Sequence, residues 1–164
     1  MILDLKKIFS NDNESLSFEY QLDLTSTDIN GFYPFVSPLA VKGTVQNHSG
    51  SAQLEANVSF DFSIPCDRCA TQINTHYQYT FHHVLVLSLN DEENDFYIQV
   101  ENYQLDLDEL LRADVLLELP TKYLCKPDCK GLCPVCGKNL NDGKCDCNMH
   151  QVDPRLEVLK QLID

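Results

Sequence analysis

The hydrophobic pattern of the chain is clearest in one long alternating run, residues 52–64. Every second side chain from Ala52 to Ile64 is apolar, and the side chains between them are polar or charged. Such a period of two places the apolar side chains on one face of a β-strand. Residues 16–24 alternate in the same way, and residues 41–45 form a shorter candidate before a turn at 48–51. The pattern therefore predicts three strands.

A second long strand is predicted to begin directly after Pro65-Cys66-Asp67-Arg68-Cys69 and to run to about residue 87. Tyr77, Tyr79 and Phe81 share one parity in this stretch, and the apolar pattern continues beyond them. Only five residues separate the two long strands, so they should form an antiparallel hairpin, with Cys66 and Cys69 at its tip. An acidic loop at 91–95 then precedes a short candidate strand at 96–100.

Two helices are predicted in the second half of the chain. Asp106 with Glu109 three residues later is typical of a helix N-terminus, and Pro120 ends the apolar pattern that follows. Near the C-terminus, Asp153-Pro154 precedes another apolar stripe and predicts a terminal helix within 151–164.

Strands in a row followed by a helix indicate an α+β fold, built on an antiparallel β-sheet or small barrel with a few helices. We expect three parts: a β-rich acidic body at 1–120 with a Cys-x-x-Cys hairpin tip, a Cys-rich zinc-binding unit at 121–150, and a C-terminal helix at 151–164.

Composition indicates a globular protein in a reducing compartment. The chain has 164 residues, of which 43% are hydrophobic, and no apolar run approaches the roughly 20 residues that cross a bilayer. The N-terminus lacks the pattern of a signal peptide. We therefore expect a cytoplasmic protein that has no membrane partner. Its eight cysteines are then metal ligands or redox groups rather than disulfides.

The net charge of −13 is unevenly distributed. Residues 1–119 hold 5 basic and 19 acidic residues, whereas residues 120–149 hold 5 basic and 3 acidic residues. An acidic body repels phosphate backbones and attracts basic proteins. Contact with nucleic acid is therefore expected only from the mildly basic segment.

The C-terminal cysteines have the spacing of a metal site. Cys133-Pro-Val-Cys136 is a rubredoxin-type knuckle, in which two thiolates reach one ion, and Gly137 provides the backbone freedom that its turn needs. Cys145 and Cys147 follow after eight residues and complete a set of four.

Four cysteines remain, and they allow a second tetrahedral site. Cys66 and Cys69 at the hairpin tip would join Cys125 and Cys129, about sixty residues away in sequence. Two alternatives stay open: one site that mixes the hairpin pair with downstream cysteines, or a metal-free redox pair.

Ligation by thiolates alone suits zinc, a rubredoxin-like iron centre or an iron–sulfur cluster. The spacings match neither common ferredoxin pattern, and zinc is favoured on frequency, with one or two ions per chain. Four protein ligands leave no position for an activated water, so the zinc is expected to be structural. No nucleophile–base motif or phosphate-binding loop is present, and we expect no enzyme activity and no small-molecule substrate.

These motifs resemble the YceD family of bacteria and plastids. The resemblance rests on Cys66-Asp-Arg-Cys69 after a long strand and on the run CKGLCPVCGKNLN at 129–141, and it covers nearly the whole chain. The Cys-rich tail is similar to the branch common in Gram-positive bacteria. The resemblance implies a role in the accumulation or processing of large-subunit (23S) ribosomal RNA, hence in ribosome assembly. It implies no catalytic residue. The residues of this chain that match the family's motifs are Cys66, Arg68, Cys69 and the tail cysteines.

Three hypotheses about function follow. The first is a metal-binding ribosome-assembly factor that contacts ribosomal RNA or the pre-ribosomal large subunit. The second is an acidic carrier or chaperone for a basic ribosomal protein, and the third is a zinc–thiol redox switch. The candidate RNA or partner contacts are Arg68, Lys122, Lys126, Lys130, Lys138 and Lys144.

Overall fold

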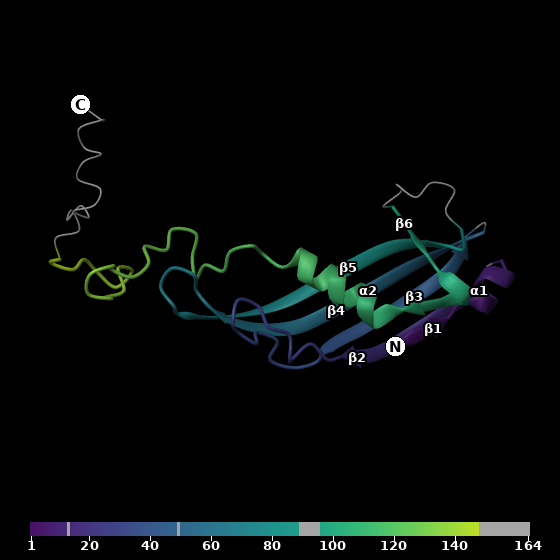
Figure 1. The fold of residues 1–164 in the computed structure, drawn as a ribbon, viewed down its shortest axis with the longest axis horizontal. Helices are drawn as coiled ribbons and strands as arrows, with labels where there is room; N and C mark the ends of the chain where they lie inside the picture. Colours follow the sequence, from purple (N-terminus) through teal and green to yellow (C-terminus); the bar gives the residue numbers. More distant parts are fainter. Residues whose placement is uncertain (13, 49, 89–95, 148–164) are drawn as a thin grey trace, which may run out of the picture. The chain divides into compact units, whose positions relative to one another are not determined.

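A computed structural model describes residues 1–12, 14–48, 50–88 and 96–147 (Figure 1). The predicted acidic loop at 91–95 and the predicted terminal helix at 151–164 lie outside these residues. The chain divides into two compact units: unit 1 is Met1–Ile64 with Ile73–Thr121, and unit 2 is Pro65–Gln72 with Lys122–Asp164. The hairpin tip is thus grouped with the Cys-rich segment.

Unit 1 is built on a five-stranded sheet with the strand order β2-β3-β4-β5-β6. The predicted strands are confirmed, and β3 extends beyond its predicted ends. Strands β2, β3 and β4 pair antiparallel, whereas β6 pairs parallel with β5, so the sheet is mixed. The bounds are β2 Ser15–Leu22, β3 Leu39–His48, β4 Ser51–Pro65, β5 Gln72–Val86 and β6 Tyr97–Gln99.

The core of unit 1 lies on the sheet face that the alternation predicted. Val41 pairs with Val58 and Val45 with Leu54, and all four side chains are buried. The even-numbered residues of β4, from Ala52 to Ile64, are buried along its whole length. Burial of such side chains contributes about 25 cal/mol for each Å² removed from water, so this face stabilises the sheet.

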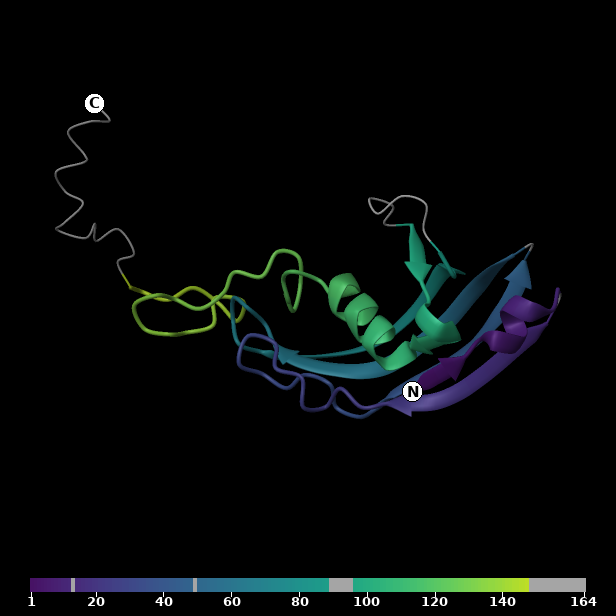
Figure 2. The same ribbon diagram turned by 45° about the vertical axis from the view of Figure 1, so that its right-hand side comes forward.

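Helix α2, Leu107–Glu118, covers part of this face (Figure 2). Its start agrees with the prediction, because the Asp106 carboxylate accepts hydrogen bonds from the N–H groups of Asp108 (3.1 Å) and Glu109 (3.3 Å). The helix buries Leu107, Leu111 and Val115. Among the described residues, no helix is both long enough and apolar enough to cross a membrane.

Four small elements complete the described part of unit 1, and the hydrophobic pattern predicted none of them. Strand β1 pairs antiparallel with β7, so the first residues of the chain lie beside the start of α2. The bounds are β1 Ile2–Asp4, α1 Lys6–Ser10, the 3-10 helix η1 Glu101–Tyr103 and β7 Gln104–Asp106.

Candidate metal centres

The loop between β4 and β5 forms a knuckle whose geometry suits a metal ion. The N–H of Cys66 donates to the carbonyl of Thr71 (2.8 Å), and the N–H of Ala70 donates back to the carbonyl of Cys66 (2.9 Å). These two bonds close a tight turn, with Ala70 in the left-handed region at φ 55°. Cys66 and Cys69 are thereby held as a pair, as the hairpin prediction required.

The second knuckle has the same backbone pattern. The N–H of Cys133 donates to the carbonyl of Lys138 (2.8 Å), and the N–H of Gly137 donates to the carbonyl of Cys133 (2.9 Å). Gly137 adopts φ 71°, the conformation for which a glycine was predicted. The two Cys-x-x-Cys motifs are therefore equivalent in local structure, although they are far apart in sequence.

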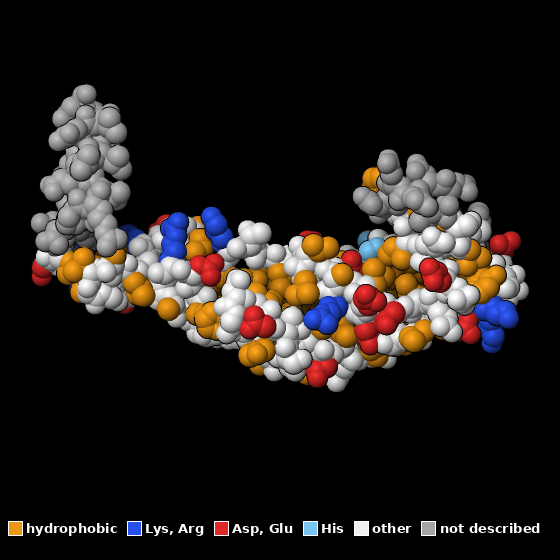
Figure 3. Space-filling model, viewed as in Figure 1, with side chains coloured by type: hydrophobic (Ala, Val, Ile, Leu, Met, Phe, Trp, Pro, Cys, Tyr) orange, Lys and Arg blue, Asp and Glu red, His pale blue; other side chains and the backbone are white. Residues whose placement is uncertain are grey.

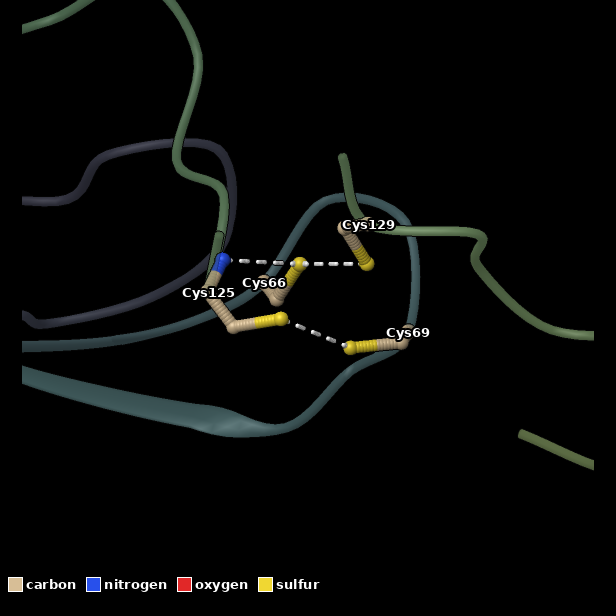
Figure 4. Close-up of side chains that lie close together, drawn as sticks. All are labelled: Cys66, Cys69, Cys125 and Cys129. Atoms are coloured by element: carbon tan, nitrogen blue, oxygen red, sulfur yellow. Dashed lines mark hydrogen bonds between the residues drawn. The ribbon is translucent and has the colours of Figure 1, made fainter. Parts of the chain in front are cut away.

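Each knuckle is completed by a second pair of cysteines. In centre A, defined as Cys66, Cys69, Cys125 and Cys129, the sulfurs point toward one another (Figure 4). The Sγ–Sγ distance is 3.8 Å between Cys66 and Cys129 and 3.5 Å between Cys69 and Cys125. Three of the four side chains are buried, and Cys125 is exposed. The second predicted set thus comes together within unit 2.

The backbone around centre A is tied together across this sequence gap. Asp67 and Tyr123 exchange two hydrogen bonds, each 2.8 Å long, from the N–H of Asp67 to the carbonyl of Tyr123 and from the N–H of Tyr123 to the Asp67 carboxylate. The Arg68 guanidinium donates to the carbonyl of Cys129 (2.8 Å). One Arg68 donor therefore braces the segment that carries a cysteine ligand.

Centre B is the set that spacing predicted: Cys133, Cys136, Cys145 and Cys147. All of its ligand atoms lie within 4.8 Å of one another, as they do in centre A. Cys133 is buried, Cys136 is exposed, and the remaining two are half-buried.

Both groups fit a tetrahedral thiolate-bound cation. With Zn–S bonds of about 2.3 Å, two sulfurs of a tetrahedral site lie about 3.8 Å apart. The sulfur distances in centre A and the 4.8 Å limit in both groups are compatible with this value. Four soft sulfur donors suit zinc or iron and make calcium or magnesium sites implausible. Two groups of four cysteines are therefore close enough to bind a metal ion each.

Electrostatics in centre A favour one thiolate over another. Burial raises the pKa of Cys66, but the backbone N–H groups of Cys125, Arg68 and Cys69 outweigh it and lower that pKa to about 6. The hydrogen bond that Cys125 makes to the Cys69 sulfur, together with burial, raises the pKa of Cys125 to about 12. A divalent cation would displace such a proton, because thiolates are the ligand form.

Centre B repeats this arrangement. The backbone N–H groups of Cys136 and Val135 lower the pKa of Cys133 to about 6, despite its burial. The hydrogen bond with the Cys136 sulfur, together with burial, raises the pKa of Cys147 to about 12. In each centre, backbone N–H donors stabilise the thiolate of the first cysteine of the knuckle.

Asn141 contacts a cysteine sulfur with which nothing in the sequence connects it. The side-chain amide of Asn141 donates to the sulfur of Cys129 (3.3 Å), and this bond is the largest cause that lowers the pKa of Cys129. In the sequence, Asn141 ends the run at 129–141 that carries the family resemblance and begins Asn-Asp-Gly, which is typical of a turn, but neither feature indicates this contact. Cysteine spacing does not indicate this contact, because Asn141 lies between two cysteines of centre B whereas Cys129 belongs to centre A.

The predicted contact residues lie on the surface of unit 2. Basic side chains project from unit 2 in Figure 3, whereas acidic side chains are prominent over unit 1. Lys138 donates to the carbonyl of Lys144 (2.9 Å) and thus also holds the centre B loop. The exposed candidates are Arg68, Lys122, Lys126, Lys130, Lys138 and Lys144.

Comparison with known proteins places these centres inside a family match. The model of the family described as "Large ribosomal RNA subunit accumulation protein YceD" matches residues 54–163, which include all eight cysteines. No solved structure matches the chain significantly.

Three relatives illustrate the range of similarity. YlbN of Bacillus subtilis strain 168 is 28% identical over 158 residues, which cover 92% of this chain and 89% of YlbN. The chloroplastic "Large ribosomal RNA subunit accumulation protein YCED homolog 1" of Arabidopsis thaliana is 36% identical over 63 residues, 38% of this chain and 20% of that protein. A Mycobacterium bovis protein is 32% identical over 102 residues, 60% of this chain and 49% of its own length. The chain thus spans most of YlbN but half or less of the other two.

Proposed function

Since the chain belongs to the YceD family, we propose that it is a metal-binding ribosome-assembly factor, which supports accumulation or processing of large-subunit (23S) ribosomal RNA in the cytoplasm. The observation that carries the proposal is the family match over residues 54–163, because it contains both four-cysteine centres. The Arabidopsis relative is named for accumulation of this RNA subunit.

The metal is proposed to be zinc, with a structural role and no enzyme activity. Zinc is favoured because two closed sets of four thiolates suit it and need no redox chemistry. A closed coordination sphere leaves no position for an activated water or a substrate. Elemental analysis of the purified, reduced protein is expected to give two zinc ions per chain. One ion per chain, or iron in place of zinc, would contradict this part of the proposal.

RNA contact is assigned to the exposed lysines of unit 2. Unit 2 contains 8 basic and 7 acidic residues, whereas unit 1 contains 4 basic and 18 acidic residues. Each zinc with four thiolates adds a net charge of −2, so the contact must come from individual lysines rather than from a uniformly positive surface. Lysine side chains bind phosphate oxygens as point charges, and such contacts position a protein on RNA without reading its sequence.

A binding assay with 23S ribosomal RNA fragments at increasing salt tests this assignment. Lys130→Ala/Lys144→Ala is expected to weaken binding and to reduce the salt slope by about 2, one for each lost phosphate contact. The matched control is Lys6→Ala/Lys7→Ala, which removes two exposed lysines of unit 1. Salt-insensitive binding, or equal effects of the two double variants, would rule out the assignment.

The charge of unit 1 favours a second candidate, an acidic carrier of a basic ribosomal protein. A net charge of −14 attracts basic proteins and repels phosphates at long range. Affinity capture with and without nuclease separates the candidates. A single basic protein that stays bound after nuclease treatment supports the carrier, whereas loss of all partners supports RNA contact.

A further inference from the structure

The two centres share one short stretch of chain. Cys129 belongs to centre A and Cys133 to centre B, and only three residues, 130–132, separate them. Two backbone hydrogen bonds hold this spacer: the N–H of Leu132 donates to the carbonyl of Arg68 (3.0 Å), and the carbonyl of Gly131 accepts from the N–H of Leu140 (2.9 Å). The spacer therefore connects the centre A knuckle to the centre B loop.

Asn141 makes the second connection, through its side chain. It lies in the loop between Cys136 and Cys145, so both ends of its loop are fixed by ligands of centre B. Its carbonyl oxygen accepts from the N–H of Lys130 (2.9 Å), while its amide nitrogen donates to the sulfur of Cys129 (3.3 Å). A residue of the centre B loop thus contacts a ligand of centre A directly.

The network around Asn141 fixes the orientation of its amide. The amide nitrogen also donates to the side-chain oxygen of Asn139 (2.9 Å), which in turn accepts from the N–H of Asn141 (3.0 Å). The opposite orientation would place an oxygen against these acceptors and a donor against the N–H of Lys130. The amide nitrogen, and not the amide oxygen, therefore faces the Cys129 sulfur.

We propose that Asn141 couples the two centres, so that metal binding at either one raises the metal affinity of the other. An ion in centre B fixes both ends of the loop and so holds the amide at the Cys129 sulfur, where it supports a thiolate ligand of centre A. An ion in centre A holds Cys129 and thereby the loop that presents the centre B ligands. The coupling is reciprocal, because linked binding equilibria change each other by the same factor. It rests on the metal-binding part of the proposed function and on no assumption about RNA.

The test is a double-mutant cycle, with Co²⁺ as the probe and thiolate–Co²⁺ absorbance in the presence of a competing chelator as the readout. The variants of the full chain are Asn141→Ala, Cys145→Ser/Cys147→Ser without centre B, and their combination. Removal of a hydrogen-bond partner of a ligand typically lowers metal affinity 10–100-fold. Asn141→Ala and the loss of centre B are each expected to lower the affinity of centre A by about this factor. Asn141→Ala should have little further effect once centre B is absent.

Equal effects of Asn141→Ala with and without centre B would overturn the coupling, as would an unchanged affinity of centre A after loss of centre B. Reciprocity adds a check, because Cys66→Ser/Cys69→Ser must weaken centre B by the same factor. The control is Asp142→Ala, an exposed neighbour that should change neither affinity. If Asn141→Ala prevents metal binding at centre B even without centre A, Asn141→Asp replaces it in the test. This variant keeps the oxygen that accepts from the N–H of Lys130 but removes the amide that donates to the Cys129 sulfur. A wild-type chain that binds no Co²⁺ would refute the metal-binding function itself, whereas two independently bound ions would refute only the coupling.

Discussion

Ala70 and Gly137 occupy equivalent positions, directly after the second cysteine of their knuckles. Both lie in the left-handed region, at φ 55° and 71°. A side chain there costs about 1 kcal/mol, which glycine avoids. We therefore predict opposite effects: Ala70→Gly stabilises the metal-bound knuckle by about 1 kcal/mol, and Gly137→Ala destabilises its counterpart by a similar amount. Chelator competition on the reduced, metal-loaded protein measures both changes.

The open surroundings of Gly137 mean that Gly137→Ala tests the backbone conformation without a steric clash. An added methyl group at Gly137 would meet no atom within 4 Å, so only the backbone conformation is tested. Two changes of the same sign, or each change opposite in sign to the one predicted, would contradict the account based on the backbone angle.

Gly43 is required for a different reason, the close approach of neighbouring strands. It lies in β3 opposite Phe18 of β2, and an added methyl group would overlap the Phe18 ring and the carbonyl oxygen of Glu55. Gly43→Ala is predicted to lower the free energy of unfolding by about 3 kcal/mol, the upper range for overpacking. Urea unfolding of the whole chain measures this loss.

The double variant Phe18→Leu/Gly43→Ala provides the control. It should recover only part of the stability, since the smaller side chain relieves one contact while the backbone oxygen of Glu55 stays in place. Full recovery, or no loss in Gly43→Ala, would contradict this account.

Among the elements, those with a repeated pattern could be predicted and the shortest could not. The alternation in β4 runs over its entire length, because every second side chain enters the core. By contrast, β1 and β7 have three residues each, and the paired residues Ile2 and Asp106 lie far apart in the sequence. No local period signals such a pairing, since the partner strand supplies its stability. The same applies to the parallel pairing of β6, whose existence was predicted but whose direction was not.

Helix α2 offers a test of the capping interaction that the sequence predicted. Asp106→Ala removes the acceptor for the N–H groups of Asp108 and Glu109 and is expected to lower the free energy of unfolding by about 1 kcal/mol. Asp106→Asn retains a capping oxygen and should restore most of the loss. Thermal unfolding of both variants gives the comparison. Equal destabilisation by Ala and Asn would show that the carboxylate charge, not the hydrogen bond, is responsible.

At the scale of the whole molecule, the two groups of four cysteines could be predicted because the spacing of cysteines in a sequence indicates which of them can share a metal ion. Cys133 to Cys147 formed one set by proximity in sequence, and the remaining four cysteines formed the other by elimination among open alternatives. The connection between the sets could not be predicted. The Asn141 contact and the Arg68 brace depend on how the hairpin loop and the Cys-rich segment come together, and this information is absent from local spacing.

Units 1 and 2 differ in what holds them together. Among the described residues, unit 2 buries only one non-cysteine hydrophobic side chain, that of Tyr123, together with four of its cysteines. Unit 1 buries the large aliphatic and aromatic side chains of the sheet and α2. If unit 2 binds metal as proposed, a loop-rich segment without an apolar core is expected to depend on that metal for folding.

Removal of metal by a strong chelator is therefore predicted to unfold unit 2 and to leave unit 1 folded. Amide hydrogen exchange distinguishes the two at single residues. The N–H groups of Leu132 and Cys133, which are bonded within unit 2, should lose protection, whereas those of Val41 and Val58 in the sheet should keep it. Re-addition of zinc should restore protection in unit 2, since its hydrogen bonds depend on the ligand geometry. Unchanged protection of Leu132 and Cys133 in protein shown to be metal-free would mean that hydrogen bonds alone hold unit 2 together.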